Sequence, residues 1–279
     1  MNTLKNRFGL NAAAIKIIAI VLMVADHVHQ MFAMSGAPNW LTWLGRPVMI
    51  MFLFASAESF YYTRNKRKYL TRLLVFCLAM SVAGAILQIK LQFPVLETGE
   101  TVTLMNNAFG TFFVAGLYML FWDMLTDGIK NRKAGKIAGA VLVFAVPLLT
   151  YFPIQLITLN FDYFMQRMSI GQLSVLLSVC ASLPSLMTVE GGPLIVLLGL
   201  LFYIFRRWRW AQVALLAAMS IAYFFMGRDS NSVQWLMIFA AIPMLLYNGE
   251  KGRSMKWFFY VFYPAHIYLL YIAAWLSIR

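Results

Sequence analysis

The chain has 279 residues, of which 62% are hydrophobic and 12% are charged, and its mean hydropathy is +0.73. Soluble domains are about half apolar and about a quarter charged, so this composition excludes a water-exposed globular enzyme and predicts an integral membrane protein. The net charge of +13 does not indicate nucleic-acid binding, because the basic residues lie between apolar runs rather than along one polar face.

Successive apolar runs, each close to the roughly 20 residues that span a bilayer, predict an all-α, polytopic membrane bundle of about nine to eleven helices. We expect one domain, residues 1–279, surrounded by membrane lipids. Residues 153–190 are expected to form a re-entrant or interfacial helix, with two short spans as the alternative. In chain order the expected spans are 12–34, 40–62, 70–90, 104–126, 135–152, 192–206, 210–226, 232–247 and 257–277.

Most of the 23 basic residues fall in five clusters between these spans. Short basic loops stay in the cytoplasm, whereas the alternate connections, near residues 36–39, 91–103 and 227–231, are almost free of Lys and Arg. The pattern predicts a cytoplasmic N-terminus and a multi-pass protein of a bacterial cytoplasmic membrane. The clusters are Lys5, Arg7 and Lys16; Arg64, Lys66, Arg67, Lys68 and Arg72; Lys130, Arg132, Lys133 and Lys136; Arg206, Arg207 and Arg209; Lys251, Arg253 and Lys256.

Two further features concern processing and cysteine chemistry. The first apolar run is long enough to span and lacks a small-residue cleavage site, so we expect a retained helix rather than a cleaved signal peptide. Cys77 and Cys180 lie in apolar stretches without metal-ligand spacing. We therefore expect two buried thiols, no disulfide and no metal site.

Charged residues inside the first two expected spans are the main indication of function. An ionised side chain at mid-membrane costs about 2.5–3.5 kcal/mol on insertion scales, yet the first span contains Lys16, Asp26 and His27, and the second contains Arg46 and Glu58. If the two spans enter from opposite sides, Asp26, His27 and Arg46 reach similar depths. Neighbouring residues of a helix point about 100° apart, so the Asp26 side chain does not readily reach the His27 ring. Asp26 is therefore expected to pair with a cation such as Arg46, which leaves His27 available.

Lys16 and His27 are eleven residues apart, close to three helical turns, so they share one face of the helix at about 16 Å from each other. An imidazole is suited to act as a general base near pH 7. Each residue also has a purely structural alternative. The Asp26–Arg46 pair can hold two helices together, and His27 can form a hydrogen bond between helices. Lys16 can extend its charge to the membrane–water interface. His29 lies nearer the outer mouth and is expected to have no chemical role.

Further motifs follow along the chain: Asp26-His27; Gly45-Arg46-Pro47 with Phe52 and Glu58; Tyr61-Tyr62-Thr63-Arg64-Asn65 with Tyr69 and Arg72; Asn106; Glu190-Gly191-Gly192; and Tyr263-Pro264-Ala265-His266. Together these motifs resemble the TraX family, named for the membrane acetylase that N-acetylates conjugative pilin. The resemblance covers nearly the whole chain, although Gly-Arg-Pro departs from the family's Gly-Arg-small-residue pattern, and Glu190 stands where an acidic-aromatic-Gly turn is expected. The ten residues between Lys16 and His27 also resemble the Arg/Lys-then-His pattern of the acyltransferase-3 family.

The resemblance implies that acetyl-CoA binds from the cytoplasm and that the intramembrane histidine, His27, is essential for transfer as a general base or an acyl relay. Asp26, Arg46 and Asn106 are the other candidate catalytic residues, with Arg46 or Asn106 stabilising the oxyanion. The arginines of the donor site are expected to grip phosphate, and His266 to contact the CoA end. The candidate donor-binding residues are Lys16, Glu58, Arg64, Arg72, Tyr263 and His266.

The acceptor stays open, since a pilin-like N-terminus, a secreted peptide and a cell-surface glycan all offer an amine or a hydroxyl. A rival function is a proton-coupled transporter or channel with Asp26, His27, Arg46 and Glu58 along its path. The lack of a detectable inverted repeat and the concentration of polar groups in the first two spans favour the enzyme. A scaffold without chemistry is the third alternative.

Overall fold

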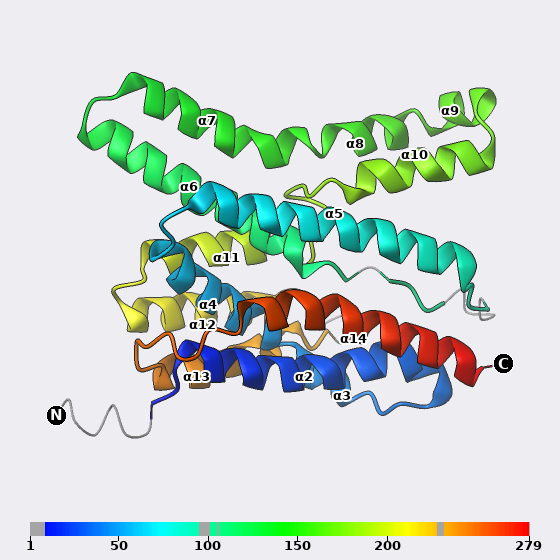
Figure 1. Ribbon diagram of the computed structural model, residues 1–279, viewed down its shortest axis with the longest axis horizontal. Helices are drawn as coiled ribbons and strands as arrows, with labels where there is room; N and C mark the ends of the chain where they lie inside the picture. The colour runs from blue at the N-terminus through cyan, green and yellow to red at the C-terminus, as the bar shows by residue number, and fades with distance from the viewer. Residues whose placement is uncertain (1–8, 95–100, 105, 228–231, 279) are drawn as a thin grey trace. The chain divides into compact units, whose positions relative to one another are not determined.

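The structure is a computed structural model that describes residues 9–94, 101–104, 106–227 and 232–278. Lys5 and Arg7 of the first basic cluster lie outside these ranges. Within them the regular structure is helical, and the one extended pairing is an isolated bridge between Leu10 and Tyr247. The predicted all-α fold is therefore confirmed (Figure 1).

Six helical stretches of the described chain are long and apolar enough to cross a membrane. The protein is thus a multi-pass membrane protein, as predicted. Three further apolar helices are shorter, at Ile170–Ser182, Gly192–Ile204 and Gln234–Leu246, so the expected number of nine to eleven spans stays a prediction. The six long stretches are Ala12–Ser35, Lys66–Lys90, Ala108–Lys130, Ala134–Leu159, Arg209–Met226 and Lys256–Ser277.

The second expected span, 40–62, is not one continuous helix. It consists of α3 (Leu41–Gly45) and α4 (Val48–Tyr61), separated at Arg46 and Pro47. Proline lacks a backbone N–H and suits the start of a helix rather than its interior, and the Pro47 carbonyl accepts a bond from the Met51 N–H at 3.0 Å. The break matters for function because it carries Arg46.

The region after the fifth expected span is helical, but it contains three helices rather than one. α7 (Ala134–Leu149) and α8 (Phe152–Leu159) together extend that span to residue 159. Then α9 (Phe161–Arg167) leads to α10 (Ile170–Ser182), which packs back against α8. The buried contact between them is formed by Ile157, Leu173 and Cys180.

The chain forms two compact units. α5 (Lys66–Lys90) and α11 (Gly192–Ile204) pass from one unit into the other. The first unit comprises Met1–Tyr61, Gln88–Leu104 and Leu201–Arg279, and the second comprises Tyr62–Leu87 and Met105–Leu200.

In the second unit, α6 (Ala108–Lys130) and α7 pack as a hairpin, whose turn is held by an ion pair between Lys136 and Asp127. The start of α5 is joined to the end of α6 by an ion pair between Lys66 and Asp123. The basic clusters at residues 64–72 and 130–136 therefore lie at the same end of this unit.

In the first unit, α2 (Ala12–Phe32) packs against α3, α4 and α14 (Lys256–Ser277). The backbone N–H of Ala12 donates to the Glu250 carbonyl at 2.8 Å, which holds the start of α2 beside the segment that leads into α14. The two helices run side by side in the same direction (Figure 1, blue and orange-red).

Three more helical segments complete the first unit. η2 packs against α12 and α4, and α13 packs against the same two helices. The 3-10 segment η2 leads directly into the short helix α13, so the expected span 232–247 is not one α-helix. These segments are α12 (Arg209–Met226), η2 (Gln234–Ala240) and α13 (Ala241–Leu246).

Candidate functional site

The candidate site lies along the contact between α2 and α14 in the first unit. Near the start of both helices, the Nζ atom of Lys16 lies 5.6 Å from the centre of the Phe259 ring. Further along both helices, His27 meets His266. Lys16 and His27 thus face the same neighbouring helix, which confirms that they share one face of α2.

His27 and His266 form a direct pair at the centre of this contact. Their side chains are buried, with 4% and 8% of each residue exposed, and Nδ1 of His27 lies 2.8 Å from Nε2 of His266. On its other side, Nδ1 of His266 lies 2.9 Å from the carbonyl oxygen of Phe262, one turn earlier in α14. The structure therefore places His266 against the candidate base His27.

Aromatic rings line the histidine pair. The Phe262 ring lies nearly parallel to the His266 ring, with 4.9 Å between their centres. Tyr263 is tilted against both imidazoles, 6.4 Å from the His27 centre and 5.9 Å from the His266 centre. Aromatic walls limit the positions that an imidazole ring can adopt and keep the surroundings of the pair largely apolar.

Asp26 and Arg46 form the ion pair that the sequence predicts. Nη2 of Arg46 lies 3.2 Å from Oδ1 of Asp26. Nε of the same guanidinium donates to the Thr42 carbonyl at 3.0 Å, and Nη1 donates to Oε1 of Gln234 at 3.3 Å. One arginine therefore joins α2, α3 and the start of η2, and its planar fork is held in a fixed orientation.

Glu58 does not join this pair but forms an ion pair of its own, and its expected place in the donor site stays a prediction. Oε1 of Glu58 is 3.5 Å from Nη1 of Arg209, and the same Nη1 donates to Oε1 of Gln212 at 2.9 Å. α4 runs back along α2, and twelve residues of helix after Arg46 carry Glu58 about 18 Å further along. The result is a second ion pair that joins α4 to α12.

The remaining predicted residues belong to the second unit. Asn106 lies two residues before the start of α6, Arg64 is exposed before α5, and Arg72 is half-buried on α5. Their assignment to the oxyanion and the donor site stays a prediction. The two cysteines, Cys77 and Cys180, are buried and free, as expected.

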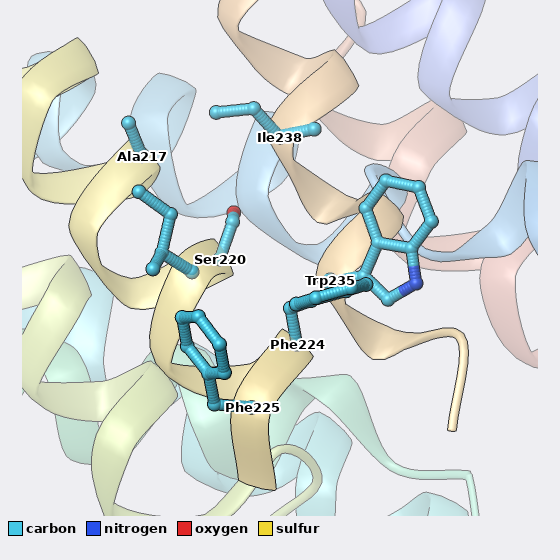
Figure 2. Close-up of a pocket in the computed structure, with 7 residues that line it drawn as sticks. Ala217, Ser220, Phe224, Phe225, Trp235 and Ile238 are labelled. Carbon is cyan, nitrogen blue, oxygen red and sulfur yellow. The ribbon is translucent and has the colours of Figure 1, made fainter. Parts of the chain in front are cut away.

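A hollow of about 370 Å³ lies between α12 and η2 (Figure 2). Ser220 supplies the one hydroxyl of its lining, and this hydroxyl is buried and has no partner in the described part of the chain. An apolar wall with one hydroxyl supplies no acid or base, so the histidine pair is the candidate site. The lining residues are Ala217, Ser220, Ile221, Phe224, Phe225, Trp235 and Ile238.

Three side chains are not identifiable from the sequence as partners of the predicted residues. Arg209 counts there only as one of a basic cluster, Gln234 only as a residue of the expected span 232–247, and His266 only as a contact of the CoA end. Their partners lie 151, 188 and 239 residues away along the chain. Residue spacing within one helix indicates a shared face but carries no information about which distant helix covers it.

Comparisons with known proteins identify the family of this chain. A sequence profile described as "TraX protein" matches residues 11–274. A segment of 75 residues is 33% identical to the "Probable fimbrial assembly protein FimC, serogroup H1" of Dichelobacter nodosus, and it covers 26% of this chain and 31% of that protein. No solved structure matches the chain. Because the profile covers nearly all of its length, this chain belongs to the TraX family.

Proposed function

We propose that this protein is a membrane-embedded acyltransferase that moves the acetyl group of acetyl-CoA to an amine or hydroxyl of an acceptor. The observation that carries the proposal is the buried pair of His27 and His266 on two parallel helices. A base held in a dry, preorganised site accepts a proton in the transition state without reorganising water. The resemblance to membrane acetylases supplies the donor.

In the proposed reaction, Nε2 of His27 takes the proton from the acceptor amine or hydroxyl as that atom attacks the thioester carbon. The C–N or C–O bond forms, the carbonyl oxygen becomes an oxyanion, and the C–S bond then breaks. The departing CoA thiolate takes up the proton from His27, so the products are the acetylated acceptor and the free thiol. The same nitrogen also suits a covalent acetyl-histidine relay.

Arg46 is the candidate for stabilising the oxyanion from the first unit. Its guanidinium is already oriented by Asp26, Thr42 and Gln234, and a preorganised donor of this kind contributes about 2.7–4 kcal/mol to transition-state stabilisation. Asp26 then acts by holding Arg46. Asn106, before α6, is the second candidate for the same task.

Lys16 is the proposed contact for the donor's phosphates. Among the described residues it makes no ion pair, and it faces α14 about 16 Å before His27. CoA carries its phosphates and its thioester at opposite ends of a long arm, so one face of α2 can hold both ends. Arg64, Arg72 and Glu58 stay further candidates for the donor site, and Tyr263 lines the histidine pair that receives the thioester.

The proposed acceptor is the N-terminal amine of a pilin or fimbrial subunit, on the strength of the family and of the relative named for fimbrial assembly. A secreted peptide or a cell-surface glycan is the alternative. The proposed location is the bacterial cytoplasmic membrane, with the basic ends of the helices and the acetyl-CoA on the cytoplasmic side.

The test uses the full chain in proteoliposomes with acetyl-CoA that carries an isotopic label in its acetyl group. A pilin N-terminal peptide with a free amine and the same peptide with a blocked amine are offered as acceptors, and mass spectrometry reads the label. Labelled acetyl on the free-amine peptide alone supports the proposal. Proton uptake by the proteoliposomes without acetyl-CoA binding or turnover contradicts it and favours the transporter.

A further inference from the structure

The direction of each hydrogen bond at the histidine pair follows from one backbone carbonyl. The Phe262 oxygen can only accept, so Nδ1 of His266, 2.9 Å away, must carry the hydrogen. A neutral imidazole carries one N–H and one lone pair. Burial disfavours a charged ring, and both rings are buried. Nε2 of His266 therefore holds the lone pair and accepts.

The hydrogen between the two rings must then come from His27. Nδ1 of His27 is 2.8 Å from the accepting Nε2 of His266, so Nδ1 is the donor. The two ring planes differ by 16°, and their centres are 5.0 Å apart. The distance between the two ring centres is longer than the distance between the two bonded nitrogens by about the diameter of one imidazole ring. The two nitrogens therefore lie on the line that joins the ring centres. The rings meet edge to edge in nearly one plane, as a linear N–H···N bond requires.

We propose that His266 is a positioning residue that fixes His27 in the Nδ1–H form and so directs the Nε2 lone pair of His27 at the reacting group. The inference rests on the proposed role of His27 as a base. A free histidine side chain in water favours the opposite tautomer, with hydrogen on Nε2. In that tautomer Nε2 has no free lone pair and cannot accept a proton. The Phe262 carbonyl and His266 together select the reactive form before any substrate binds.

Two variants separate positioning from packing. His266→Phe keeps an aromatic ring against Phe262 but removes the acceptor, whereas His266→Gln keeps an acceptor on a flexible side chain. We expect His266→Phe to lower kcat by about 10- to 100-fold with little change in the KM for acetyl-CoA, and His266→Gln to restore part of kcat. Equal losses in both variants, or a KM effect alone, would overturn the positioning role.

A spectroscopic measurement tests the inference even if no transfer is found. The chain has three histidines, so nitrogen NMR of protein labelled with ¹⁵N-histidine, with His29→Gln for assignment, resolves the tautomer of each ring. We expect hydrogen on Nδ1 of His27 in the wild type and on Nε2 in His266→Phe. Hydrogen on Nε2 of His27 in the wild type overturns the inference, while failure of the transfer assay alone bears only on the proposed function.

Discussion

The carboxylate of Asp26 occupies the space that a side chain on Gly45 would fill. A Cβ atom built on Gly45 lies 2.1 Å from Cγ of Asp26, and within 2.5 Å of both carboxylate oxygens. Glycine is therefore required directly before Arg46, because it lets the carboxylate approach the end of α3. There Oδ1 of Asp26 lies 3.2 Å from Nη2 of Arg46.

Gly45→Ala is expected to displace Asp26 and weaken its pair with Arg46. A forced overlap of this kind lowers the free energy of unfolding by about 1–3 kcal/mol. Gly135→Ala is the control, because a Cβ there meets nothing within 4 Å. Thermal unfolding in detergent compares the two variants, and equal stability would show that Asp26 does not need this space.

Asp26→Asn, Arg46→Gln and the double variant form a thermodynamic cycle for the ion pair. The side chains are 20% and 30% exposed, so we expect a coupling of about 0.5–3 kcal/mol rather than the value of a fully buried pair. Each single variant leaves one partly buried charge behind, and the double variant is expected to be more stable than the sum of the single effects predicts. Strictly additive effects on the unfolding free energy would argue against a direct pair.

Arg209→Ala is expected to destabilise the first unit by about 1–3 kcal/mol, because it leaves Glu58 and Gln212 without their donor. It also removes a cation over the Phe54 and Tyr247 rings. Arg253→Ala, at an exposed position, is the matched loss of charge. The midpoints of thermal unfolding of the two variants are compared. Equal midpoints would show that the Arg209–Glu58 ion pair does not stabilise the first unit.

Lys16→Ala is expected to raise the KM for acetyl-CoA about tenfold or more with little change in kcat, because a charge-assisted bond to phosphate contributes about 1.5–3 kcal/mol. Lys16→Arg should retain most of the affinity. Lys130→Ala removes the same charge from an exposed helix end and serves as the control. A kcat effect without a KM effect would place Lys16 in the chemical step instead.

The sidedness of the helices can be measured by labelling single cysteines, introduced after Cys77 and Cys180 are replaced by alanine. A cysteine at Asn39, an exposed position beyond the end of α2, is expected to react with an impermeant maleimide in intact cells. A cysteine at Asn131, in the basic α6–α7 turn, is expected to react only after the membrane is opened. The reverse pattern would invert the predicted orientation.

Much of the architecture follows from the sequence because the bilayer imposes one strong requirement, an apolar run of spanning length. The first helix and the Asp26–Arg46 pair are correct for this reason, since the depth of a residue can be counted from the end of its span. The division of 40–62 at Pro47 is visible only as a local helix breaker, which does not reveal whether the helix bends or stops.

The histidine pair shows where sequence reasoning ends. The depth of His27 in the membrane and the helix face on which it lies follow from its position in the sequence. His266 becomes its partner only because α14 packs in parallel with α2. The partner of Glu58 is hidden in the sequence for a related reason, because Arg209 lies on another helix, 151 residues further along the chain. Contacts between distant helices are set by packing of the whole unit rather than by local pattern.

The most direct test of the central claim is the release of CoA thiol from acetyl-CoA by the purified protein in a lipid bilayer, with hydroxylamine as the surrogate nucleophile. His27→Ala is compared with His29→Ala, a half-buried neighbour on the same helix whose Nδ1 bonds to the Ala37 carbonyl. We predict a loss of about 100-fold or more in His27→Ala and near wild-type release in His29→Ala. Equal release by both variants, each folded as the wild type, would contradict His27 as the reacting base.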